Sequence, residues 1–209
     1  MMKYKLVIFD FDGTLANTFP WVLDNMDQVA DKFKLDRVDR NEIETLRTFD
    51  LRKLMKYFDV PPWKLAIMAR HVRTHLAEDI QQVSLFEGVD QLLQYLSEQG
   101  MKLAVVSSNS YENVRHVLGP INAALIDYYE CGVSVFGKSS KFRKILHKSG
   151  VEPADVISIG DEIRDIQAAK HVHIASGAVS WGFSSVDALK AQSPHELFAS
   201  VGDIAEKIT

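Results

Sequence analysis

Short, continuous apolar runs alternate along the chain with longer stretches of helical spacing. Three of the runs are followed at once by polar residues: residues 6–9, 103–106 and 156–159. An apolar run of this length without alternation is typical of a strand buried on both faces. Parallel strands end at a common edge, so these runs predict a parallel sheet with polar chemistry along that edge. Residues 129–135 and 174–181 are weaker strand candidates.

The segments between the runs have helical periodicity. Val89, Leu92, Leu93 and Leu96 recur at spacings of three and four, and Gly100 is a typical C-terminal stop. This order of strand, helix and strand predicts an α/β fold: a Rossmann-like parallel sheet with helices on both faces.

One segment, residues 15–83, interrupts the alternation. It has the pattern of several helices, one of them over residues 63–80, and no strand candidate. We therefore expect two domains: an α/β core made of residues 1–14 and 84–209, and an inserted α-helical cap domain of residues 15–83. The segment 15–83 is termed the insert below.

Composition narrows the functional classes. The 209 residues are 46% hydrophobic and 25% charged, which is enough apolar material for a folded core. The net charge of −4 gives no basis for a nucleic-acid partner. No apolar run is long enough for a membrane span or a signal peptide, and Cys131 is the single cysteine. We expect a cytoplasmic protein without a membrane partner, either a monomer or a small homo-oligomer.

Two carboxylates follow the first strand. Asp10 and Asp12 would repel each other by roughly 4 kcal/mol at about 4 Å and an effective dielectric near 20. They must share a proton, bind a cation or diverge in direction, and Gly13 permits a tight turn around a ligand. A solvated Asp-Gly turn is the plain alternative.

The third strand also ends in acids. Asp161 and Asp165 are four residues apart and would share one face of the following helix. Acidic residues are also ordinary in a first helical turn. If this strand neighbours the first one, however, three or four carboxylates converge. Such a cluster favours a hard divalent cation, most simply Mg²⁺, accompanied by a phosphorylated ligand.

Phosphate-binding candidates follow the second strand and precede a later helix. Ser107, Ser108 and Asn109 offer hydroxyl, amide and backbone donors, although such residues are more often helix caps. Lys138 could add a point charge against the same phosphate, and Lys141 is a rival one turn further along.

These residues together resemble a known family. The segment from Asp10 to Leu15, Asp-Phe-Asp-Gly-Thr-Leu, looks like the first motif of the haloacid dehalogenase superfamily in its phosphatase branch. Ser107 resembles the second motif, Lys138 the third, and Asp161 with Asp165 the fourth, in the family's order. The resemblance covers nearly the whole chain, with the insert as the helical cap. The segment 179–183 is similar to the phosphoglycolate phosphatase and pyrophosphatase subgroup.

The resemblance implies a mechanism for a small phosphorylated metabolite. Asp10 would be the nucleophile that forms an aspartyl-phosphate, and Asp12 would protonate the leaving group and then activate water. Mg²⁺ would be held by the Asp10 carboxylate, the Asp12 backbone carbonyl and Asp161, with Asp165 in the outer shell. Ser107, Ser108, Asn109 and Lys138 would bind the phosphoryl group.

Two alternatives remain open at this point. A β-phosphoglucomutase-like phosphotransferase uses the same core, and a catalytically idle relative would only bind a phosphometabolite. A phospho-acceptor receiver module is disfavoured because it has no helical insert after its first strand. Basic residues of the insert are candidate substrate contacts, but we expect solvated helix faces there. They are Arg47 with Arg52 and Lys53, and the stretch from Arg70 to His75.

Overall fold

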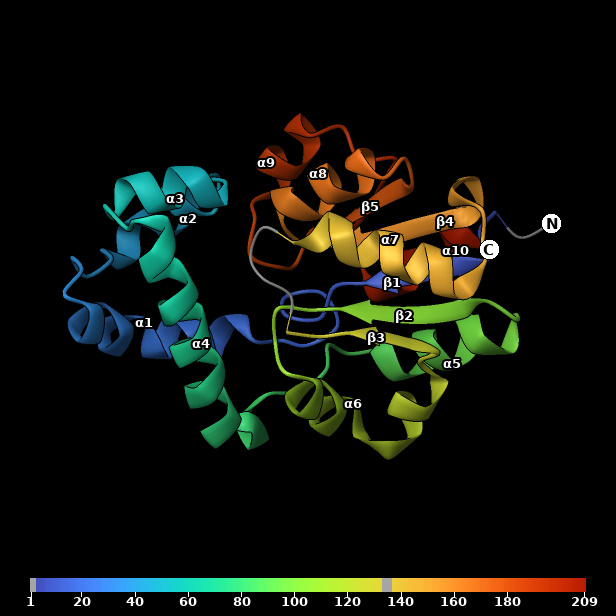
Figure 1. Cartoon of the computed structure of the whole chain (residues 1–209), viewed down its shortest axis with the longest axis horizontal. Helices are drawn as coiled ribbons and strands as arrows, with labels where there is room; N and C mark the ends of the chain where they lie inside the picture. Colours follow the sequence, from blue (N-terminus) through green and yellow to red (C-terminus); the bar gives the residue numbers. More distant parts are fainter. Residues whose placement is uncertain (1–2, 133–136) are drawn as a thin grey trace.

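A six-stranded parallel sheet forms the centre of the protein (Figure 1). The computed structural model describes residues 3–132 and 137–209. The strand order is β3-β2-β1-β4-β5-β6, and every neighbouring pair is parallel. The strands are β1 (Leu6–Phe9), β2 (Lys102–Val106), β3 (Tyr128–Glu130), β4 (Val156–Gly160), β5 (Ala175–Val179) and β6 (Glu196–Phe198).

The three strands predicted from apolar runs lie side by side in the middle of this sheet. Every residue of β1 is fully buried, as expected for a strand covered on both faces. In the register, Phe9 of β1 pairs with Val105 of β2 and with Ile159 of β4. The residues directly after these strands are therefore neighbours at one edge.

Helices cover both faces of the sheet. One face packs against α5 (Val89–Glu98), α6 (Tyr111–Leu125) and α10 (Val201–Ile208), and the other against α7 (Lys138–Ser149) and α8 (Ile163–His171). The short α9 (Val186–Ala191) contacts α8, and a 3-10 turn, η3 (Pro153–Asp155), precedes β4. This arrangement confirms the predicted α/β class.

The insert consists of helices that lie beside the edge where the strands end (Figure 1). Its two connections to the core run together: Asn17 N donates to Ser84 O at 2.8 Å, and Phe86 N donates to Leu15 O at 2.9 Å. The division into two domains at residues 14 and 84 stays a prediction. The helices are α1 (Phe19–Phe33), η1 (Arg40–Glu42), α2 (Ile43–Leu46), α3 (Leu51–Tyr57), α4 (Pro62–Glu78) and η2 (Ile80–Gln82).

The predicted elements differ from the observed ones mainly at their ends. The predicted helix over 63–80 is α4, which ends at Glu78 before a separate 3-10 turn. The strand expected over 129–135 is short, and residues 133–135 lie outside the described part of the chain. Strand β6, with three residues, was not predicted. Among the described residues, none of the helices combines the length and apolar character that crossing a membrane requires.

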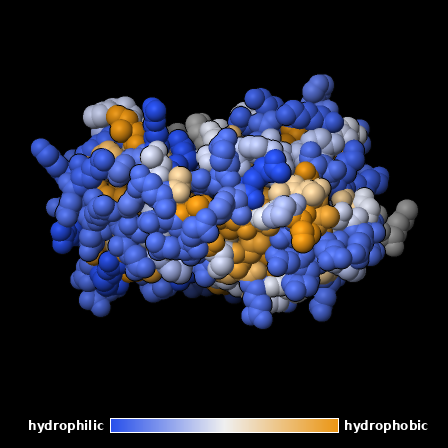
Figure 2. All heavy atoms as spheres, turned by 90° about the horizontal axis from the view of Figure 1, so that it is seen from below, coloured by the Kyte–Doolittle hydropathy of each residue, from blue (hydrophilic) through white to orange (hydrophobic). Residues whose placement is uncertain are grey.

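Figure 2 shows one face of the molecule, on which the insert is predominantly hydrophilic and hydrophobic residues gather over α5 and α6. Some apolar residues of the insert are nevertheless exposed: Tyr57, Trp63 and Ile67 have exposed fractions of 48%, 66% and 53%.

Candidate active site

Asp10 is the first residue after the central strand and is almost completely buried. Its side chain is 5% exposed, and the Phe11 amide donates to its Oδ1 at 2.8 Å. Lys138 Nζ lies 2.8 Å from its Oδ2 and also forms an ion pair with Asp165. A buried carboxylate in contact with a buried ammonium is therefore present at the middle of the sheet edge.

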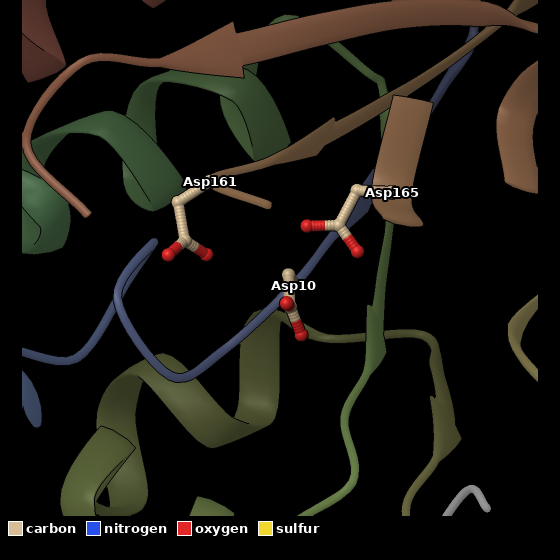
Figure 3. A group of neighbouring side chains, drawn as sticks. All are labelled: Asp10, Asp161 and Asp165. Atoms are coloured by element: carbon tan, nitrogen blue, oxygen red, sulfur yellow. The ribbon is translucent and has the colours of Figure 1, made fainter. Parts of the chain in front are cut away.

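Asp161 and Asp165 lie close to Asp10, and both come from the segment that follows the neighbouring strand β4. Asp161 follows β4, and Asp165 lies in the first turn of α8, where its Oδ2 accepts from the Glu162 amide at 3.0 Å. Asp161 precedes the helix, so the expectation that both acids share a helix face was wrong. They meet because a strand end and a first helical turn adjoin. One carboxylate oxygen from each of Asp10, Asp161 and Asp165 lies within 4.8 Å of the others (Figure 3).

Glycines allow these carboxylates to approach the backbone. A Cβ on Gly13, which has φ +76°, would lie 2.3 Å from Asp161 Oδ2, and one on Gly160 would lie 2.3 Å from Asp165 Oδ2. Neither position has room for a side chain. Gly13 and Gly160 are thus required by close packing against the acids.

The cluster holds more negative charge than its lysine balances. Burial raises the pKa of Asp10 to about 7, even though Lys138 opposes this shift. Burial and the neighbouring Glu162 and Asp10 carboxylates raise the pKa of Asp161 well above its usual range. Burial would lower the pKa of Lys138, but Asp10 and Asp165 outweigh it and the pKa is raised. Lys138 therefore remains charged, and the carboxylates call for a further cation.

The donor set suits a hard divalent cation. All three groups are carboxylates, the ligand type that such ions prefer, and one oxygen of each lies within 4.8 Å of the others. Asp161 already accepts from Thr14 Oγ1 at 2.8 Å and from the Phe183 amide at 2.7 Å. These two bonds orient its carboxylate and leave lone pairs for a metal.

Asp12 points to different partners from Asp10. Its two oxygens accept from Ser107 Oγ and from Asn109 Nδ2, each at 3.2 Å. Of the arrangements open to this acidic pair, the structure has the one in which the carboxylates diverge. Burial raises the pKa of Asp12, although the Asn109 and Ser107 hydrogen bonds oppose the change. A raised pKa favours a carboxyl that can hold and release a proton.

The loop after β2 brings the predicted phosphate-binding residues beside Asp12. Ser107 and Asn109 are buried, and the Asn109 amide donates to Ser107 Oγ at 2.8 Å. The helix cap is the next residue, Ser110, so the loop residues are not used as caps. Ser108 contributes its carbonyl, which accepts from Arg73 Nη1 of the insert at 3.0 Å.

The two candidate lysines have different surroundings. Lys138 is the first residue of α7 and lies among the carboxylates of the cluster. Lys141 Nζ lies 3.1 Å from Glu130 Oε2 at the end of β3. Of the two, the structure brings only Lys138 into contact with Asp10.

Several contacts at the site were missed by sequence reasoning. Thr14, within the first motif, bonds Asp161, and Arg47 donates from Nε to the Phe183 carbonyl at 3.1 Å and from Nη2 to the Gly182 carbonyl at 2.9 Å. The expectation of solvated helix faces was therefore wrong for Arg47 and Arg73. A basic residue on a helix has no sequence pattern that separates a core contact from a solvated charge. Trp181 packs against the core cluster, and its Nε1 donates to the Thr14 carbonyl.

Comparisons with known proteins agree with this geometry. The family model described as haloacid dehalogenase-like hydrolase matches residues 7–179. A phosphoglycolate phosphatase from Synechococcus elongatus is 30% identical over 206 residues, covering 98% of this chain and 97% of that protein. The pyrophosphatase PpaX from Bacillus cereus is 22% identical, with 97% and 95% covered.

Solved structures show the same fold. A haloacid dehalogenase-like hydrolase from Streptococcus pneumoniae superposes with a TM-score of 0.81 at 18% identity, and the match covers 100% of both chains. The sheet order, the motif residues at its edge and these matches lead to one conclusion. The chain belongs to the haloacid dehalogenase-like hydrolase family.

Proposed function

We propose that the protein is a Mg²⁺-dependent phosphatase that hydrolyses a small phosphorylated metabolite through an aspartyl-phosphate on Asp10. One observation carries this proposal. Asp10 is buried at the end of the central strand, in contact with Lys138 and within 4.8 Å of the Asp161 and Asp165 carboxylates. The names of the relatives, a phosphoglycolate phosphatase and a pyrophosphatase, support phosphate ester or anhydride hydrolysis.

Asp10 is assigned as the nucleophile. Its position next to Lys138 places one oxygen where an ammonium neutralises it, and the Phe11 amide fixes the other. Attack of a carboxylate oxygen on phosphorus forms the acyl phosphate and expels the alcohol, which divides one difficult displacement into two easier steps.

Asp12 is assigned as the acid and base. Its raised pKa favours donation of a proton to the leaving alkoxide in the first step. The carboxylate that results can then take a proton from the water that hydrolyses the acyl phosphate. Ser107 and Asn109 hold this side chain away from Asp10, so the two carboxyl groups can perform different roles.

The metal would be held by Asp10 and Asp161, with the Asp12 carbonyl as a third protein ligand and Asp165 as an outer ligand. When bound, Mg²⁺ supplies positive charge that offsets repulsion between the Asp10 carboxylate and the phosphate. Lys138 would bind a phosphoryl oxygen while Asp165 orients its ammonium. The loop of Ser107, Ser108 and Asn109 supplies further donors to the same group.

Phosphate release from 4-nitrophenyl phosphate tests the proposal. We expect Mg²⁺-dependent turnover in the native chain and a loss of at least about 10⁴-fold in Asp10→Asn, which removes the nucleophilic oxygen. Asp187→Asn, an exposed acid at the start of α9, is the matched control and should keep full activity. Turnover in Asp10→Asn near the native rate would refute the nucleophile, and a requirement for a bisphosphate activator would indicate a phosphomutase instead.

A further inference from the structure

A cavity of about 510 Å³ lies between the insert and the core, and Asp12 is part of its wall. The core contributes the polar end, with Ser108 and Asn109 from the phosphate-binding loop. The insert contributes most of the remaining lining through α1, α2, α3 and α4. Because Asp12 is the proposed acid for the leaving group, the cavity begins where the leaving group must lie.

The wall away from the catalytic carboxylates is apolar. Eighteen of the twenty-seven residues that line the cavity have hydrophobic side chains, so the cavity offers few polar partners beyond its core end. Examples are Phe19 and Met26 of α1, Leu54 of α3, and Ala69 and Val72 of α4. A polar leaving group placed there would lose its hydrogen bonds to water without replacement, which disfavours its binding.

The cations at the polar end already have partners. Arg47 Nη1 donates to Glu44 Oε1 at 2.9 Å, while its other nitrogens bond core carbonyls. Arg164 forms an ion pair with Glu162 through Nη2, whereas its buried Nε has no hydrogen-bond partner among the described residues. Arg73 donates to the Ser108 carbonyl. Two of these three charges are therefore neutralised by carboxylates within the protein, which leaves little net positive charge to attract an anionic leaving group.

From this arrangement we infer that the preferred substrates are phosphomonoesters whose leaving alcohol carries an apolar alkyl or aryl group of several carbons, held in the insert cavity. The inference rests on the proposed phosphatase function and adds the chemical class of the substrate. The phosphoryl group would lie at the Asp10 end and the apolar group among the helices. The volume falls within the range of ordinary small-molecule pockets and exceeds what a two-carbon leaving group fills.

A series of n-alkyl phosphates tests this inference, since ethyl, butyl, hexyl and octyl phosphate have leaving groups of nearly equal chemical reactivity. Burial of one methylene improves binding about fourfold at most. We expect kcat/KM to rise at least about thirtyfold from ethyl to hexyl phosphate, and to exceed that for phosphoglycolate. A flat series, or a preference for phosphoglycolate, would overturn the inference and leave the phosphatase function intact. Absence of phosphate release from every ester would instead refute both.

A matched pair of variants in α4 locates the apolar subsite. Ala69 lines the cavity, whereas Ala66 lies on the exposed side of the same helix. Ala69→Trp fills part of the cavity, so the ratio of kcat/KM for hexyl over ethyl phosphate should fall at least about tenfold. Ala66→Trp should leave that ratio unchanged. Equal ratios in the two variants would contradict the assignment, and the native alkyl series decides the question even if Ala69→Trp fails to fold.

Discussion

The sheet edge that holds the catalytic carboxylates and the cavity wall supplied by the insert differ in character: the first is polar and the second is apolar. At the sheet edge, the oxygens of Asp10, Asp12 and Asp161 each accept from a named donor or contact a cation. In the insert, the wall is apolar and encloses about 510 Å³. The comparison indicates that the chemistry is fixed by the strand ends, while the space for the remainder of the substrate is set by the helices.

The difference follows from how each region is held. Strand β1 lies between two fully paired neighbours, and Gly13 and Gly160 leave no room for the acids to shift toward the backbone. The insert contains short helices, such as the four-residue α2. It is joined to the core by two connecting segments, by arginine hydrogen bonds, and by apolar residues such as Trp21 that share the hydrophobic cluster of the sheet. Arg47 and Arg73 are two of the points where the sheet edge and the insert meet.

The sharpest test of the rigid end is Asp12→Asn, because it keeps the size and shape of the side chain but removes the transferable proton. For hexyl phosphate, whose alkoxide requires protonation, we expect kcat/KM to fall about 10²- to 10⁴-fold. For 4-nitrophenyl phosphate, whose leaving group departs unprotonated, the loss in kcat/KM should be about tenfold or less. Equal losses for the two esters would show that Asp12 acts by position alone. Asp10→Asn serves as the reference in which both esters are lost.

A second test compares two lysines of α7 that pair with different carboxylates. Lys138 is buried between Asp10 and Asp165, so Lys138→Met leaves buried carboxylates unpaired and should lower the free energy of unfolding by about 3–5 kcal/mol. Lys141 is 23% exposed against Glu130, which also pairs with Lys148. Lys141→Met should therefore cost about 1 kcal/mol or less.

Urea unfolding in metal-free buffer measures both lysine variants. Addition of Mg²⁺ should restore more of the lost stability in Lys138→Met than in Lys141→Met, because only the first variant leaves an excess of charge at the metal-binding cluster. Equal losses in the two variants would contradict the assignment of Lys138 as the balancing cation.

Much of the rigid end could be predicted from the sequence. Apolar runs that end in acids identified β1 and β4, and the rule that parallel strands end together placed Asp10 near Asp161. Such reasoning works because four buried apolar residues in a row have few other structures available. It missed β6, since three residues give too little pattern to separate a strand from a loop.

The direction of the Asp12 side chain and the contacts of the insert could not be predicted from the sequence. The spacing of Asp10 and Asp12 left three arrangements open, and the choice depends on donors almost one hundred positions away, Ser107 and Asn109. The cavity depends on how helices of the insert pack around one another, and amphipathic patterns specify an inward face but not the volume that it encloses. The hydrogen bonds of Arg47 and Arg73 to core carbonyls likewise join segments that are distant in the sequence and share no local pattern.

The smallest expected effect concerns the junction between the two ends. Arg73 Nη1 donates to the Ser108 carbonyl, whereas Arg70, one turn earlier in α4, is exposed. Arg73→Gln removes one charged hydrogen bond between the insert and the phosphate-binding loop, worth about 1.5 kcal/mol, so KM should rise about tenfold. The value of kcat should change less than twofold, because Asp10 and Asp12 keep their own partners. Steady-state kinetics with hexyl phosphate measure both constants, and Arg70→Gln is the control with unchanged KM. If Arg73→Gln lowered kcat instead, α4 would be part of the catalytic end, and the separation between a rigid reacting edge and a substrate-selecting cavity would have to be abandoned.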